Sequence, residues 1–222
     1  MTALRPFAAA WIAAAAAAVL VGAAVGAEPA TVVVFGDSLA AGNALPRGER
    51  ANAWVPRVER LAASRLRIVN EGKPGRSLDS AAELEEALAR APRIDLLVLA
   101  LGTNDSGDLV SGSVARATHR MRALIATARR RAVPLILLVG PPDISTVALA
   151  GAPAAAERRS RNLAELNQAF AGLASELDCR FVSLYATVSK ASLARDGVHP
   201  DSAGNGAMAR AMLPALLDAA AR

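Results

Sequence analysis

Three residue types that together support nucleophilic catalysis occur near the two ends of this sequence. Ser38 lies in Gly36-Asp37-Ser38, and His199 lies in Asp196-Gly197-Val198-His199-Pro200. A serine hydroxyl is a weak nucleophile at neutral pH and needs a base that titrates near pH 7, which histidine provides. The other histidine, His119, falls among arginines in a helical stretch, where a solvated side chain is expected. His199 is therefore the candidate base for Ser38.

Asp196 completes the set, because it precedes His199 by three residues and Gly197 lets the chain bend between them. Its carboxylate could accept a hydrogen bond from the second ring nitrogen of His199, fix the tautomer and stabilise the imidazolium. Asp196, His199 and Ser38 are thus predicted to form a triad.

Acyl transfer through a tetrahedral intermediate also needs hydrogen-bond donors for the negatively charged oxygen. The candidates are the backbone N–H of Ser38, the backbone N–H of Gly75 and the side-chain amide of Asn104. Together they are predicted to form an oxyanion hole.

The elements that position these residues are five short strands, predicted at residues 31–35, 66–70, 94–101, 133–139 and 180–184. Several of these runs are continuously apolar, which is typical of parallel strands covered on both faces. Helical patterns lie between them, around 78–88 and over 114–131, 154–177 and 202–221. This alternation predicts one doubly wound α/β domain with the candidate residues at the carboxyl edge of its sheet.

Four sequence blocks resemble those of the SGNH (GDSL) hydrolases. They are Gly36-Asp37-Ser38, the segment from Asn70 to Ser77 with Gly75, Gly102-Thr103-Asn104-Asp105, and Asp196 to Pro200. The resemblance covers about residues 31–217 and is closest to small secreted lysophospholipase and arylesterase-like members. It implies a three-layer α/β/α flavodoxin-like sandwich with a five-stranded parallel sheet. It also implies Ser38 as nucleophile, His199 as base, Asp196 as its orienting group, and Ser38, Gly75 and Asn104 as oxyanion donors.

The activity that the resemblance implies is hydrolysis of a small ester or lipid, of lysophospholipase, arylesterase or thioesterase type, with no cofactor and no metal. The alternative is an O-acetylesterase acting on envelope polysaccharide. An acyl pocket is expected near Ser38, Trp54 and Asn104 and along the loop 141–153, whose aliphatic side chains could equally serve the core. A noncatalytic binding module and a nucleotide-binding domain are the other classes. The loop after the first strand lacks a phosphate cradle, which disfavours the latter.

The first 27 residues are predicted to be a secretory signal peptide. Arg5 precedes an apolar run, and Val25-Gly26-Ala27 supplies the small residues of a cleavage site before Glu28. Residues 28–222 would then be one hydrolase domain in the periplasm or outside the cell. Because the run is nearly long enough to span a bilayer, a retained anchor is the alternative.

Composition limits the partners further. The sequence carries 25 Lys and Arg against 20 Asp and Glu, and Arg5 is the only charged side chain of residues 1–27, which leaves a net charge of +4 beyond them. Basic runs at 129–131 and 158–161 could contact an anionic envelope or membrane, although solvated helix faces explain them equally. With one Tyr, and with Trp54 the only Trp after residue 27, base-stacking platforms are lacking and nucleic acid is excluded. A monomer is expected.

Overall fold

A computed structural model describes residues 28–108, 110–144 and 152–221; the predicted signal peptide lies outside these residues. Its elements in chain order are β1 Ala30–Gly36, α1 Ser38–Ala41, η1 Arg47–Asn52, α2 Trp54–Leu61, β2 Leu66–Gly72, α3 Ala81–Arg90, β3 Leu96–Ala100, η2 Asp105–Gly107, α4 Ser113–Arg130, β4 Ile136–Gly140, α5 Pro153–Glu176, β5 Arg180–Ser183, η4 Lys190–Ser192 and α6 Ser202–Ala220.

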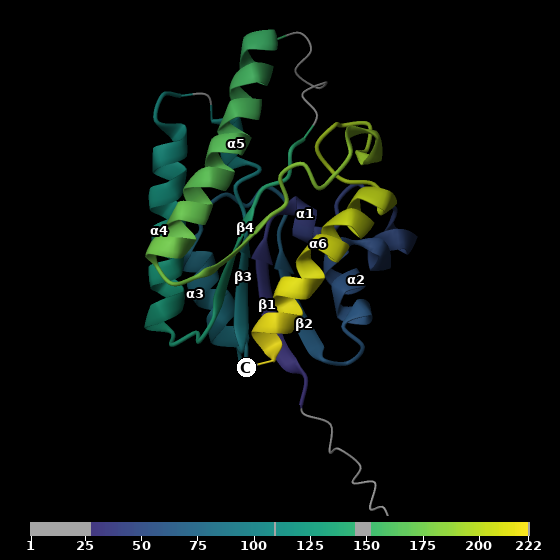
Figure 1. Ribbon diagram of the computed structural model, residues 1–222, viewed down its shortest axis with the longest axis vertical. Coiled ribbons are helices and arrows are strands. Elements are labelled where there is room, and N and C mark those ends of the chain that lie inside the picture. The colour runs from purple at the N-terminus through teal and green to yellow at the C-terminus, as the bar shows by residue number, and fades with distance from the viewer. Residues whose placement is uncertain (1–27, 109, 145–151, 222) are drawn as a thin grey trace, which may run out of the picture.

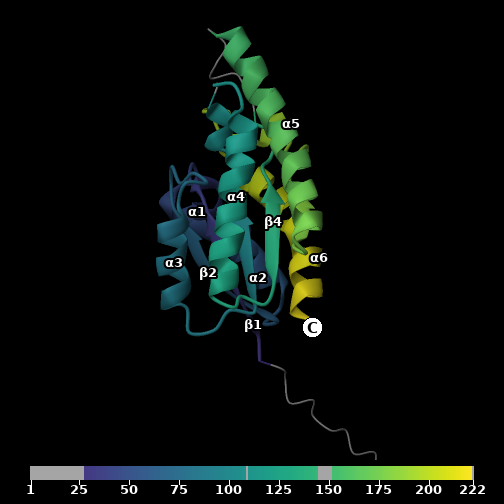
Figure 2. The same ribbon diagram turned by 90° about the vertical axis from the view of Figure 1, so that its left-hand side faces the viewer.

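The five strands form one parallel sheet in the order β2-β1-β3-β4-β5, so the order reverses at β1. Between β1 and β3, Val32 pairs with Leu96 and Gly36 pairs with Ala100. Helices cover both faces, as Figures 1 and 2 show. This arrangement confirms the predicted α/β fold with a five-stranded parallel sheet.

Two hydrophobic cores follow from the alternation of side chains along the strands. Val33, Phe35 and Leu99 point to one face and pack with α3, α4 and α5. Val32 and Val34 point to the other face and pack with α1, α2 and α6. Because both faces of the sheet are buried, the sequence of the central strands is continuously apolar.

Helix α2 carries a proline at its third position, Pro56, where no backbone N–H is needed for the helix. Trp54, Val55 and Val58 face the core from this helix and are nearly inaccessible to solvent. Within the described ranges, no helix is both long and apolar enough to cross a membrane.

Candidate active site

Ser38 begins the short helix α1, directly after the buried strand β1. Asp37 caps this helix by accepting a hydrogen bond from the Leu39 backbone N–H at 2.9 Å. A Cβ at Gly36 would lie 2.5 Å from the Cβ of Ala40, so the tight turn from strand to helix requires glycine there. The sequence thus fixes the serine at the carboxyl edge of the sheet, where the order of the strands reverses.

His199 lies beside this serine, although 161 positions separate them in the chain. Its Nε2 atom is 2.9 Å from Ser38 Oγ, and its Nδ1 atom is 2.7 Å from Asp196 Oδ2. A neutral imidazole with its proton on Nδ1 would donate to Asp196 and accept the hydroxyl proton of Ser38. The structure therefore brings together all three residues of the predicted triad.

The loop from Asp196 to His199 is held by its own backbone. Asp196 Oδ1 accepts from the N–H groups of Val198 and His199 at 2.8 and 2.9 Å, and Gly197 adopts a φ of 68°. Partial burial opposes ionisation of Asp196, but these hydrogen bonds and the one to the His199 ring together lower its pKa. The carboxylate is therefore charged at neutral pH and can stabilise an imidazolium.

Gly75 and Asn104 follow the neighbouring strands β2 and β3. Gly75 has a φ of 77°, which favours glycine, and no described atom lies within 4 Å of the position of a Cβ there. Asn104 Nδ2 donates to the Arg76 carbonyl at 2.8 Å, which leaves its second N–H for another acceptor. Asp105 strengthens the link between the two loops, because its carboxylate accepts from the Leu78 N–H.

Arg76 is a positioning residue that sequence reasoning missed. Its guanidinium carbon lies 3.9 Å from the ring centre of Phe35, and its Nη1 donates to the carbonyls of Gly36, at 2.9 Å, and Glu71. Its Nε pairs with Glu83 at 3.2 Å. One buried side chain thus joins the carboxyl ends of β1 and β2, next to Gly75. The basic side chain after Gly75 was the signal in the sequence, but nothing local indicated its burial.

Asn205 is a second residue that sequence reasoning missed. Its side chain donates to the carbonyls of Pro200 and Asp201, both at 2.9 Å, and accepts from the Trp54 backbone N–H at 3.0 Å. The asparagine is 1% exposed, so these bonds are shielded from water. It therefore ties the end of the His199 loop to helix α2.

Asp37 is a buried carboxyl group next to this constellation. Burial raises its pKa to about 6, and the hydrogen bond from Leu39 and the proximity of His199 only partly oppose this shift. Its Oδ2 atom has no hydrogen-bond partner among the described residues. A carboxyl group whose ionisation is unfavourable therefore lies beside the candidate nucleophile.

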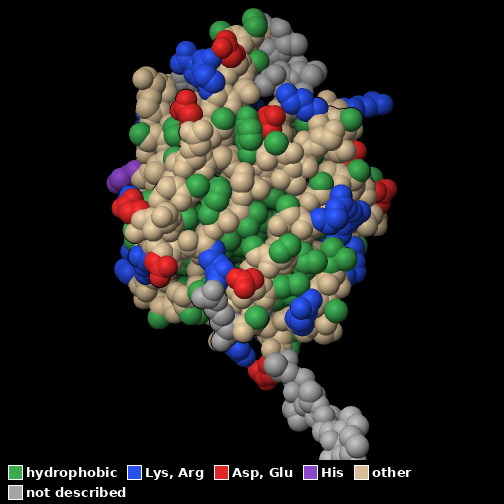
Figure 3. Space-filling model, in the orientation of Figure 1, with side chains coloured by type: hydrophobic (Ala, Val, Ile, Leu, Met, Phe, Trp, Pro, Cys, Tyr) green, Lys and Arg blue, Asp and Glu red, His purple; other side chains and the backbone are tan. Residues whose placement is uncertain are grey.

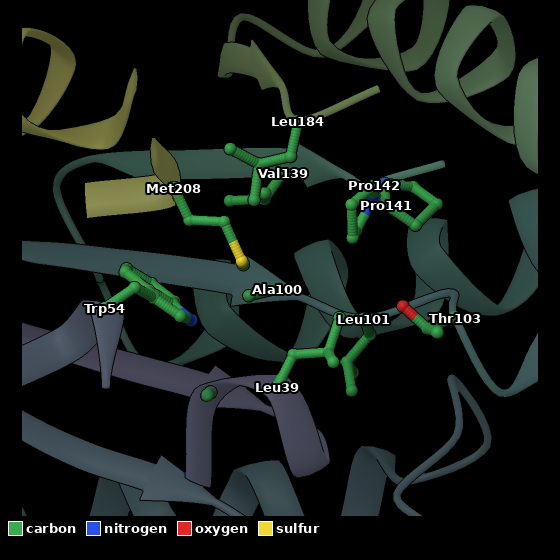
Figure 4. A pocket seen from close by; sticks show the side chains of 11 residues that line it. Leu39, Trp54, Ala100, Leu101, Thr103, Val139, Pro141, Pro142, Leu184 and Met208 are labelled. Atoms are coloured by element: carbon green, nitrogen blue, oxygen red, sulfur yellow. The ribbon is translucent and has the colours of Figure 1, made fainter. Parts of the chain in front are cut away.

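A small apolar cavity of about 20 Å³ lies beside the candidate residues. Leu39, which follows Ser38, and Thr103, which precedes Asn104, are among its lining residues. Figure 4 shows how its side chains enclose the space; the full lining is Leu39, Ala40, Trp54, Ala100, Leu101, Thr103, Val139, Pro141, Pro142, Leu184 and Met208.

The predicted acyl pocket coincides with this cavity at Leu39, Trp54 and the start of the loop after β4. Residues 145–151 of that loop lie outside the described residues. Ile144 is buried but does not line the cavity, and the indole N–H of Trp54 has no acceptor in the described chain.

His119 is exposed on α4, as expected for a solvated side chain. No group of three or more His, Cys, Asp and Glu side chains within the described ranges could hold a metal.

The sequence profile of the GDSL-like Lipase/Acylhydrolase family matches residues 34–207, which include all the candidate residues. The chain belongs to this family. Its resemblance to the SGNH (GDSL) hydrolases and its assignment as an SGNH-type ester hydrolase are thereby confirmed.

Solved structures of the family share the fold of this GDSL hydrolase. A carbohydrate acetylesterase family member from Sinorhizobium meliloti is 27% identical, with a TM-score of 0.72 over 87% of this chain and 100% of that one. A proposed arylesterase from Agrobacterium tumefaciens str. C58 is 29% identical, with a TM-score of 0.72 over 85% and 99% of the two chains. The aryl esterase of M. smegmatis, at 21% identity and a TM-score of 0.74 over 85% and 99%, supports the fold alone. Comparison with curated proteins found no match.

Proposed function

We propose that this GDSL hydrolase cleaves carboxylic esters through an acyl-enzyme intermediate formed on Ser38. The observation that carries the proposal is the continuous hydrogen-bonded chain from Ser38 Oγ through the His199 ring to Asp196, at 2.9 and 2.7 Å. This is the arrangement in which a histidine can remove the serine proton while the oxygen attacks.

In the first half of the proposed cycle, Ser38 Oγ forms a bond to the ester carbonyl carbon while its proton passes to His199 Nε2. The negative charge on the carbonyl oxygen is stabilised by the N–H groups of Ser38, Gly75 and Asn104. Collapse of the intermediate breaks the bond to the alcohol oxygen, which takes the proton from His199. The product alcohol leaves and the acyl group stays on Ser38.

In the second half, water attacks the acyl carbon while His199 accepts a proton from it. The new intermediate uses the same donors, and its collapse returns the proton to Ser38 Oγ and releases the carboxylic acid. Asp196 stays ionised throughout, holds the Nδ1 proton of His199 and balances the imidazolium charge. The proposed cycle therefore consumes one water per ester.

The substrate that the site favours has a short acyl group. A cavity of about 20 Å³ is little larger than the roughly 10–15 Å³ that one water molecule requires. This size is nearer to the methyl group of an acetyl ester than to a long acyl chain, which supports acetyl as the proposed acyl group. The carbohydrate acetylesterase family member from Sinorhizobium meliloti named above, at 27% identity, supports the same choice and makes an O-acetylated polysaccharide the second candidate substrate.

The test is steady-state hydrolysis of p-nitrophenyl esters from acetyl to palmitoyl by the purified protein and by Ser38→Ala. We expect kcat/KM to be highest for acetate and to fall with each added carbon, and the variant to lose at least 1,000-fold. Full activity in a folded Ser38→Ala protein would refute the nucleophile. A rate that rises with acyl length would refute the acetyl preference and favour a lysophospholipid or thioester. Inactivity on every ester would favour a noncatalytic binding module.

A matched control is Ser106→Ala, because Ser106 is also buried and its hydroxyl bonds, among the described residues, to the Thr103 carbonyl and to Arg159. It should keep most of the activity on acetate. Release of acetate from an O-acetylated polysaccharide would then distinguish the second candidate from a general arylesterase. Hydrolysis of aryl acetates without release of acetate from the polymer would exclude the polysaccharide as a substrate.

A further inference from the structure

A basic groove of about 410 Å³ lies between helices α2 and α6. Three of its lining residues are arginines and none is acidic; the lining is Asn52, Arg57, Arg60, Leu61, Gly206, Ala209 and Arg210. It shares no residue with the cavity beside Ser38. Figure 3 shows basic side chains on the side of the molecule that carries α2 and α6. We call this feature the α2–α6 groove.

Two guanidinium groups of the groove converge over Gly206. An ideal Cβ at that glycine would lie 2.4 Å from Arg57 Nη1 and 3.5 Å from Arg210 Nη1, so the two nitrogen atoms are no more than about 6 Å apart. The missing side chain at Gly206 thus creates the space that the Arg57 guanidinium occupies. Two like charges at this distance repel each other unless an anion lies between them.

No described carboxylate within 4.0 Å neutralises the arginines of the groove. Arg57 Nη2 donates to Ser202 Oγ at 2.8 Å, and Arg60 Nη1 donates to the Ala51 carbonyl at 2.6 Å. These neutral acceptors orient the guanidinium groups without cancelling their charge. On the other side of the molecule, by contrast, Arg122 forms an ion pair with Glu176 at 2.6 Å.

We propose that the α2–α6 groove binds a phosphate group, either free or carried by a lipid headgroup. Guanidinium groups bind phosphate oxygens through paired N–H donors, and the Arg57 and Arg210 groups are close enough to each other to contact one anion. The volume of the groove suits a phosphate with its attached organic group. Leu61, at 51% exposure, also lines the groove and could contact the apolar part of a lipid.

The first arm of the test measures binding of inorganic phosphate by isothermal titration calorimetry at constant ionic strength. We expect Arg210→Gln to weaken binding at least tenfold. The matched control Arg67→Gln, which removes the same charge from an exposed position on β2, should leave it unchanged. Thermal unfolding of each variant checks that the fold is intact.

Gly206→Ala is the sharper variant, because it keeps the net charge and raises helix propensity in α6. Its new Cβ would overlap Arg57 Nη1, so the guanidinium must move and phosphate binding should fall at least fivefold. Unchanged binding in both Gly206→Ala and Arg210→Gln would overturn the proposal, as would equal losses in Arg210→Gln and Arg67→Gln.

The second arm uses sedimentation with phosphatidylglycerol vesicles and with phosphatidylcholine vesicles. Binding to vesicles that Gly206→Ala weakens, without measurable binding of inorganic phosphate, would assign the groove to a lipid headgroup. Binding of inorganic phosphate alone would assign it to a soluble phosphate compound. Absence of binding in both arms would refute the groove as a phosphate site.

Discussion

Replacement of Asp37 by asparagine should change the pH dependence of folding stability. The asparagine Oδ1 can still accept the Leu39 N–H that caps α1 at 2.9 Å, so the turn into the helix is kept. The substitution removes only the ionisation of a carboxyl group that is 1% exposed. Its effect therefore reports the free-energy cost of holding a charge at this position.

The size of the effect follows from the pKa of Asp37, which burial raises from 3.8 to about 6. A raised pKa means that the folded state favours the protonated carboxyl, so ionisation destabilises the fold. At about 1.4 kcal/mol per pKa unit, the full penalty is about 3 kcal/mol. It is fully present only well above pH 6 and absent well below 3.8, and about 1.5 kcal/mol of it should vanish between pH 8 and pH 5.

The assay is urea unfolding of the wild-type protein and Asp37→Asn at pH 8 and pH 5, followed by circular dichroism. The gain in unfolding free energy from the substitution should be about 1.5 kcal/mol larger at pH 8. Any constant contribution of the new amide cancels in this comparison. The exposed Asp178→Asn is the control and should show no such difference. Equal effects of Asp37→Asn at both pH values would refute the reasoning.

Four further outcomes are expected. Asp196→Asn should lower kcat for p-nitrophenyl acetate by about 10³- to 10⁴-fold with little change in KM, because the His199 tautomer is no longer fixed; a loss below tenfold would contradict this. Arg76→Met should lower the unfolding free energy by about 2–4 kcal/mol in urea titrations, because two carbonyls lose their donor. Met208→Ala should raise the rate on butyrate relative to acetate by about tenfold, since it enlarges the cavity. Mass spectrometry of protein exported by a bacterial host should find Glu28 at the N-terminus; a chain that keeps residue 1 would indicate an anchor.

Much of the fold could be predicted because it depends on local pattern. The run Val32 to Val34 is buried on both faces, so it has no polar alternation and marks a central parallel strand. Helix α2 had no predicted range, since Pro56 reads as a helix breaker unless its place in the first turn is known. Strand β3 is shorter than expected, at Leu96–Ala100 rather than 94–101.

Ser38, Gly75 and Asn104 could be predicted because each follows the end of a strand by a few residues, where parallel sheets place their ligands. Asp196 and His199 lie well after β5, and they could be predicted from their residue types and their spacing of three. Their distances could not, because Ser38 and His199 are brought together by the whole fold. Arg76 and Asn205 were missed for the same physical reason. Most of their hydrogen-bond partners are backbone carbonyls and N–H groups, which every residue carries, so the sequence does not show which of them a side chain will bind.

The late position of the His199 loop in the chain determines when the predicted triad can assemble during synthesis. Its carboxylate and imidazole are arranged by hydrogen bonds within four residues, and a bridge between Leu193 and Pro200 closes the loop. Ser38 leaves the ribosome 161 residues before His199. Under the proposed mechanism, a nascent or truncated chain therefore holds Ser38 without its base, and hydrolysis becomes possible only when the last loop docks on the completed sheet.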